Sequence, residues 1–145
     1  MIHSLLNRLL SSEPQRLPPP DARLALAALL VRVARADGDY SEVERQRVDA
    51  VLARQSNMSP FEAAALRSEA EEIEASAPDT VRFTRALKAA TDLGDRVSLM
   101  EALWSVALSD GKRDAEEDTL LRMVADLLGL RDVDSALARQ RAERG

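Results

Sequence analysis

Hydrophobic residues along most of the chain recur at intervals of three and four residues, the spacing that places side chains on one face of an α-helix. Over residues 120–128, for example, Leu120, Leu121, Val124 and Leu128 share a face. Proline, glycine and helix-capping residues separate such segments. The expected helices cover about 22–36, 42–56, 60–74, 81–91, 97–109, 115–128 and 132–143. With aromatic residues at only 3%, the pattern predicts an all-α fold: a single-domain bundle of seven to eight helices.

The first twenty residues have a different character. Leu5, Leu6, Leu9 and Leu10 fall at helical spacing, which predicts a short amphipathic helix that docks on the main body. Four prolines between positions 14 and 20 then oppose helix formation. We therefore divide the chain into an N-terminal amphipathic helix with a Pro-rich linker, residues 1–20, and a helical domain, residues 21–145.

Part of the helical domain occurs twice. Residues 34–44 and 107–117 each contain Asp-Gly and then a Glu seven residues after the Asp, at a constant offset of 73 residues. The identical pairs are Leu30/Leu103, Val33/Val106, Ala34/Ala107, Asp37/Asp110, Gly38/Gly111, Glu44/Glu117 and Val51/Val124. Each copy predicts a helix hairpin with an acidic corner. Two helices separate the hairpins, so antiparallel neighbours would bring both corners to one end, related by an approximate twofold.

Composition excludes several kinds of chemistry. The chain has no Cys and a single His, His3, which removes His- or thiolate-ligated zinc and the common nucleophilic triads. The net charge is −5 and no basic block occurs, so nucleic-acid binding is not expected. No apolar run approaches the roughly 20 residues of a membrane span. We expect a soluble cytoplasmic protein.

The carboxylates of the two corners are the candidate site. Asp37 and Asp110 stand at the expected C-terminal ends of helices, where an acid is disfavoured by up to about 1 kcal/mol. Without His or Cys, only oxygen ligands are available, and these suit Ca²⁺, Mg²⁺ or Mn²⁺. The predicted metal ligands are Asp37, Glu44, Asp110 and Glu117, and the outer acidic candidates are Asp39, Glu42, Asp114 and Glu116.

The corners also have an explanation that needs no ligand. The glycine of each corner suits the left-handed residue that ends a helix. Ser41 with Glu44 has the spacing of a capping box, and Asp114 with Glu117 repeats it. Lys112 lies close enough in sequence to neutralise nearby acids. On this interpretation the repeat is a pair of well-capped hairpins.

Catalysis is a further alternative. Paired carboxylates act as general acid and base in glycosidases, and a metal-dependent enzyme would use the same cluster. The acids stand at helix ends with no evident aromatic-lined cleft, however, and this favours a non-enzymatic protein.

The doubled (Ala/Ser)-Asp-Gly-x5-Glu pattern resembles the tellurite-resistance TerB family and the TerB-like domain of some membrane-anchored J-domain proteins. Segments 33–38, 104–111 and 117–121 carry the same resemblance, which covers about residues 24–130. The resemblance implies a small all-helical bacterial protein with a role in stress or tellurite resistance. It also implies an acidic surface proposed for metal binding, made here by the four predicted ligands, and membrane-anchored partners.

Together these observations predict a non-enzymatic interaction module with an acidic surface that binds a divalent cation (Ca, Mg or Mn) or a basic protein partner. The module would be cytoplasmic, or peripheral to the inner membrane through its partners. Leu5 and Leu9 suit a dimer as well as a monomer.

Overall fold

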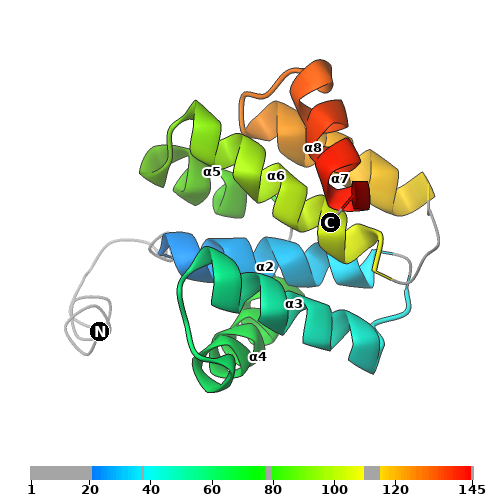
Figure 1. Ribbon diagram of the computed structural model, residues 1–145. Coiled ribbons are helices and arrows are strands. Elements are labelled where there is room, and N and C mark those ends of the chain that lie inside the picture. Colours follow the sequence, from blue (N-terminus) through cyan, green and yellow to red (C-terminus); the bar gives the residue numbers. More distant parts are fainter. Residues whose placement is uncertain (1–20, 37, 78–79, 110–114, 145) are drawn as a thin grey trace.

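The described part of the chain is all-helical. The computed structural model describes residues 21–36, 38–77, 80–109 and 115–144. These residues form seven α-helices and no strand, as the sequence predicts (Figure 1). The helices are α2 (Ala22–Arg35), α3 (Glu42–Gln55), α4 (Pro60–Ser76), α5 (Val81–Ala90), α6 (Leu93–Ala107), α7 (Ala115–Leu127) and α8 (Asp132–Arg144). The predicted N-terminal helix and linker, residues 1–20, lie outside the described residues.

Helix α2 is the centre of the fold. Every residue from Ala25 to Val31 is at most 4% exposed, and seven consecutive residues point in all directions around a helix. The helix contacts α3, α4, α5, α6 and α7, and Figure 1 shows it running through the middle of the molecule. Small side chains such as Ala27 and Ala28 let these neighbours approach closely. The longest apolar run of the sequence is therefore the core of the bundle.

Polar caps fix where several helices begin. In four places a side chain accepts a hydrogen bond from the backbone amide three residues later, as the sequence predicts; these residues are Asp21, Ser41, Ser59 and Asp92. Helix α6 begins at Leu93, earlier than the predicted start near residue 97. The reason is local, because Asp92 caps the helix and the Asp95 carboxylate accepts a hydrogen bond from the Asp92 amide.

The repeat predicted from sequence is present in the helices. Helix α3 starts at Glu42, and α7 starts at Ala115, its equivalent one repeat later. Leu30 and Leu103, which occupy the same position in α2 and α6, are both fully buried. In Figure 1 the C-terminal ends of α2 and α6 and the first turns of α3 and α7 all lie at the right-hand end of the bundle. We call this the corner end.

Helix α8 turns small residues toward the core, and its larger apolar residues face outward. Val133 and Leu137 are 50% and 46% exposed. The buried residues are instead Ser135 and Ala138. These small side chains allow α8 to pack closely on α6, where Ser135 accepts a hydrogen bond from the Trp104 indole at 3.3 Å. The close approach of α8 to α6 and the hydrogen bond between Trp104 and Ser135 account for the orientation of this helix.

Helix α4 carries a run of acidic residues that is only partly solvated. Glu69 and Glu72 are exposed, but the Glu74 side chain is only 11% exposed. Its carboxylate accepts from Arg32 Nε at 3.1 Å and from Arg35 Nη1 at 2.6 Å. Arg32 also donates to two backbone carbonyls at the end of α4, which carry the partial negative charge of a helix C-terminus. The run therefore contains a packing contact between α2 and α4.

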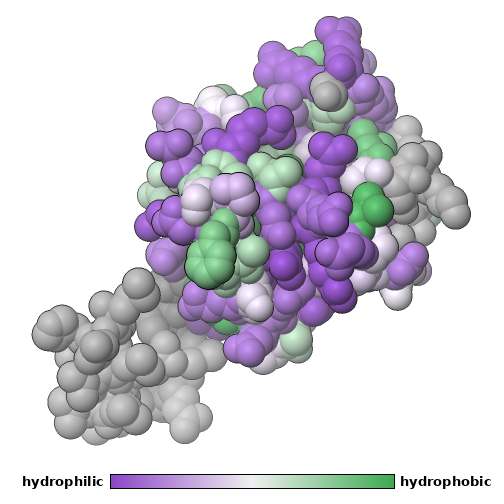
Figure 2. All heavy atoms as spheres, turned by 60° about the horizontal axis from the view of Figure 1, so that its bottom comes forward, coloured by the Kyte–Doolittle hydropathy of each residue, from purple (hydrophilic) through white to green (hydrophobic). Residues whose placement is uncertain are grey.

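The outer surface is mainly polar. Figure 2 shows one face with hydrophilic side chains over most of its area and apolar residues in small separate groups. Within the described ranges, Phe61 is the most exposed of the bulky apolar residues, at 85%. Among the described helices, none combines the length and apolar character that crossing a bilayer requires.

Candidate functional site

The predicted site residues fall into three groups in the structure. Glu44 and Glu117 are buried, at 3% and 2% exposure. Asp39, Glu42 and Glu116 are exposed. The remaining predicted residues, Asp37, Asp110 and Asp114, lie outside the described residues. Burial of the two equivalent glutamates was not predicted, because a Glu in the first turn of a helix is ordinarily solvated.

Glu44 is held by the capping box at the start of α3. Its Oε1 accepts from the Ser41 backbone amide at 3.2 Å and from the Ser41 hydroxyl at 3.3 Å, while Ser41 Oγ accepts from the Glu44 amide at 3.3 Å. The partial positive charge of the helix N-terminus favours a carboxylate at this position. The capping interpretation of this residue is therefore confirmed.

Glu117 stands at the equivalent place in the second copy. It is the third residue of α7, as Glu44 is the third residue of α3, and both helices begin at the corner end (Figure 1). The fold thus repeats a buried carboxylate in the first turn of two helices that start at the same end of the molecule.

An aromatic residue fixes the first corner. Two guanidinium groups lie over the Tyr40 ring, that of Arg35 at 5.0 Å and that of Arg45 at 4.9 Å from the ring centroid. Burial, together with the nearby carboxylate of Glu71, raises the pKa of the Tyr40 hydroxyl, so the phenol is neutral at physiological pH. Cation–π contacts of this kind are worth roughly 0.5–1 kcal/mol each at exposed sites. Tyr40 therefore connects the end of α2 with the start of α3.

Behind Tyr40, an arginine links α3 to α4. Arg67 Nε donates to Asp49 Oδ1 at 2.6 Å, and Arg67 Nη1 donates to Glu71 Oε2 at 3.1 Å. All three side chains are at most 24% exposed. Burial acts to lower the pKa of Arg67, but the hydrogen bond and charge of Asp49 and the charge of Glu71 together raise it. This ion-pair network holds the first corner against α4. The link between α3 and α4 could not be predicted from a local pattern, because Asp49 and Arg67 are 18 residues apart in the chain.

The described residues do not by themselves supply a cation site. Among them, no three carboxylate or imidazole side chains are grouped closely enough to hold a metal ion. A complete ligand set drawn from the predicted residues would therefore include Asp37, Asp110 or Asp114. The buried Glu44 and Glu117 are the predicted ligands that the structure places.

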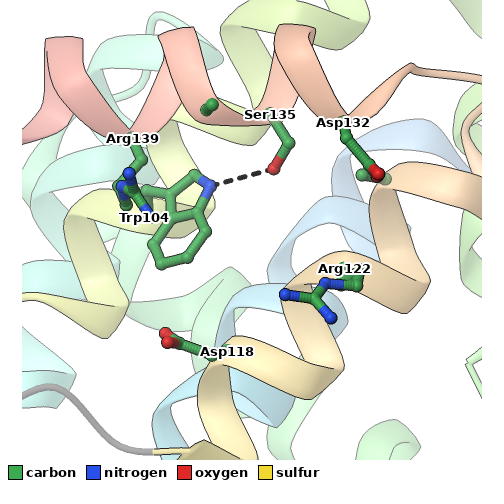
Figure 3. Close-up of a pocket in the computed structure, with 8 residues that line it drawn as sticks. Trp104, Asp118, Arg122, Asp132, Ser135 and Arg139 are labelled. Carbon is green, nitrogen blue, oxygen red and sulfur yellow. Dashed lines mark hydrogen bonds between the residues drawn. The ribbon is translucent and has the colours of Figure 1, made fainter.

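Close to the second corner, a cavity of about 190 Å³ opens between α6, α7 and α8. Figure 3 shows the Trp104 indole on one side, with Asp118 and Arg122 projecting from α7 toward the space beside it. Arg139 lies over the indole at 5.8 Å. The titratable lining residues are two aspartates, Asp118 and Asp132, and two arginines. Their charges balance, so this cavity has no net preference for an anion or a cation.

A second cavity, of about 360 Å³, lies between α3, α6 and α8. Neither this cavity nor the one beside Trp104 is lined by Glu44 or Glu117. Sequence analysis predicted neither cavity, since each is formed by side chains from three separate helices.

The structure defines a class of protein: an all-α domain that contains two equivalent helix hairpins, α2–α3 and α6–α7, with α2 at its centre. The chain belongs to the tellurite resistance protein TerB family, whose model matches residues 23–140 of the 145-residue chain. This confirms the resemblance inferred from the doubled Asp-Gly motif. Searches of curated proteins and of solved structures gave no match.

Proposed function

We propose that this TerB-family protein is a non-enzymatic interaction module, and that its corner end binds a divalent cation and a protein partner. The observation that carries the proposal is the pair of buried carboxylates, Glu44 and Glu117, at equivalent positions of two helices that start at the same end. Each is preceded in sequence by an aspartate seven residues earlier, Asp37 or Asp110.

Electrostatics support a positively charged ligand there. The exposed Glu42 and Glu116 add negative charge beside the two buried groups. Carboxylate oxygens without imidazole or thiolate favour Ca²⁺, Mg²⁺ or Mn²⁺, and the same field would attract a basic protein surface.

The metal proposal is tested by NMR titration of amide shifts with Ca²⁺, Mg²⁺ and Mn²⁺ in turn. We expect saturable changes, or Mn²⁺ broadening, near Gly38 and Gly111. We also expect their loss in the double variant Asp37→Asn/Asp110→Asn. No change at those glycines at millimolar metal would refute the proposal.

A matched control separates a site from general charge. Glu69→Gln with Glu72→Gln also removes two carboxylates, but from the exposed face of α4. This variant should bind metal as the wild type does. Equal weakening in both double variants would mean that only the overall negative charge matters.

The partner proposal rests on family membership and on the acidic surface. We propose a protein partner with a basic docking surface, carried by a membrane-anchored protein, so that the module is cytoplasmic and peripheral to the inner membrane. Pull-down from solubilised membranes should recover a partner that Asp37→Asn/Asp110→Asn loses and Glu69→Gln/Glu72→Gln retains. Recovery of the same proteins by both variants would count against the corner end as the docking surface.

Two observations support a non-enzymatic role over a metal-dependent enzyme at the same carboxylates. Glu44 is engaged in capping, and both cavities lie beside other residues. Turnover of a phosphate ester or of a glycoside would overturn this part of the proposal if it requires metal and disappears in Asp37→Asn/Asp110→Asn.

A further inference from the structure

The cavity between α3, α6 and α8 carries positive charge in an acidic protein. Three arginines line it, Arg47 and Arg54 from α3 and Arg141 from α8, against a single carboxylate, Glu101. The whole chain has a net charge of −5. A local excess of positive charge in a hollow therefore opposes the overall balance, and it would concentrate anions there. We call this hollow the arginine cavity.

Small side chains of α6 form its floor. Ser98, Ala102 and Ser105 lie on one face of that helix at intervals of three to four residues, and all three line the cavity. Bulky residues at these positions would fill the space between α3 and α8. The cavity volume of about 360 Å³ is within the range of sites for small ligands.

The three arginines are available to a ligand. Within the described part of the chain, no carboxylate forms an ion pair with Arg47, Arg54 or Arg141. This contrasts with Arg32, Arg35 and Arg67, which each pair with an acid. Arg47 and Arg54 are two helical turns apart on α3, roughly 10 Å along its axis, and Arg141 faces the same hollow from another helix.

The polar groups of the floor restrict the kind of ligand that fits. The Ser105 hydroxyl donates to the Ala102 carbonyl at 2.7 Å, and the Ser109 hydroxyl donates to Val106 at 2.8 Å. Their protons are used, so the serine oxygens, like Glu101, offer acceptors. A ligand that fits has an anionic end for the guanidinium groups and hydroxyl groups for these acceptors.

We propose that the arginine cavity binds a phosphate group, either as the free ion or as a small hydroxylated phosphomonoester. Guanidinium groups donate paired hydrogen bonds to phosphate oxygens in a geometry that a lysine does not match. A doubly charged phosphate would use arginines from both helices, and so would bridge α3 and α8. This site is separate from the corner carboxylates, and its existence does not depend on metal binding there.

The test is an NMR titration at constant ionic strength with inorganic phosphate, with glycerol phosphate, and with chloride in place of either. We expect saturable shifts for amides around Gln55 and Ser105 with a phosphate compound and none with chloride. The double variant Arg47→Gln/Arg141→Gln should weaken phosphate binding at least tenfold, because it leaves only one of the three guanidinium groups.

Two single variants are the matched controls. Arg85→Gln removes an exposed arginine of α5, and Arg122→Gln removes one from the cavity beside Trp104; both should bind phosphate as the wild type does. Tighter binding of glycerol phosphate would identify a phosphomonoester as the ligand, and equal binding would identify the free ion. Linear, non-saturating shifts, or equal affinity in Arg47→Gln/Arg141→Gln, would overturn the proposal. A thermal melt of the double variant confirms that it is folded.

Discussion

The contact of Glu74 with two arginines predicts a measurable loss of stability on removing one charge. In Glu74→Gln, an amide of the same shape replaces a carboxylate that bridges Arg32 and Arg35. Hydrogen bonds to charged groups are worth about 1.5–3 kcal/mol each. Arg35 is 35% exposed, so solvent screens its share, and Arg32 keeps its two backbone carbonyl partners. We therefore expect a net cost of about 2 kcal/mol.

The assay is urea unfolding followed by circular dichroism, with thermal melts in parallel. For a domain of this size about 2 kcal/mol corresponds to a decrease in Tm of roughly 6 °C. The control is Glu72→Gln, two residues earlier in the same helix and exposed, which should change stability by less than about 0.5 kcal/mol. Equal stability of the two variants would refute the reasoning, because it would mean that Glu74 contributes no more than an exposed glutamate.

Three further predictions concern the core and the caps. Leu103→Ala should cost about 3 kcal/mol by urea unfolding, because the side chain is fully buried. Gly38→Ala should destabilise by about 1 kcal/mol through its φ of +83° alone, since a Cβ there meets nothing within 4 Å, whereas Gly94→Ala, inside the first turn of α6, should stabilise slightly in the same assay. The hydrogen bond from the Ser59 amide lowers the pKa of Glu62 below its ordinary 4.5; its stabilising contribution is therefore complete above that value and disappears as pH falls through the folded-state pKa. The free energy of unfolding of Glu62→Gln and of the wild type is measured as the pH is lowered. The difference between the two proteins should become smaller as Glu62 is protonated in the wild type.

The helices and their caps could be predicted because their signals are local. Ser59 precedes Pro60 and stands three residues before Glu62, and this short segment contains the whole cap that the structure shows. The repeat is equally readable, since identical residues recur at one offset. The range of α8 was predicted in the same way, but its orientation depends on how closely α6 approaches, and hydrophobicity alone would favour Val133 and Leu137 as the buried residues.

In the candidate site, too, local features could be predicted and contacts between helices could not. The capping role of Glu44 follows from its spacing to Ser41, but its burial depends on neighbouring helices. Tyr40 and Arg67 are single residues in polar surroundings, and nothing in their immediate sequence indicates that they lie in one cluster. Long-range ion pairs of this kind depend on the complete fold.

The position of α2 has a consequence for how the molecule opens. This helix contacts five others, so its backbone amide protons should exchange with solvent only when the entire bundle unfolds. Helix α8 contacts chiefly α6 and α7, and its detachment would leave α2 covered on most sides. Deuterium uptake should therefore be slowest around Leu29 and much faster in α8, so that one wall of the arginine cavity belongs to the helix that exchanges first.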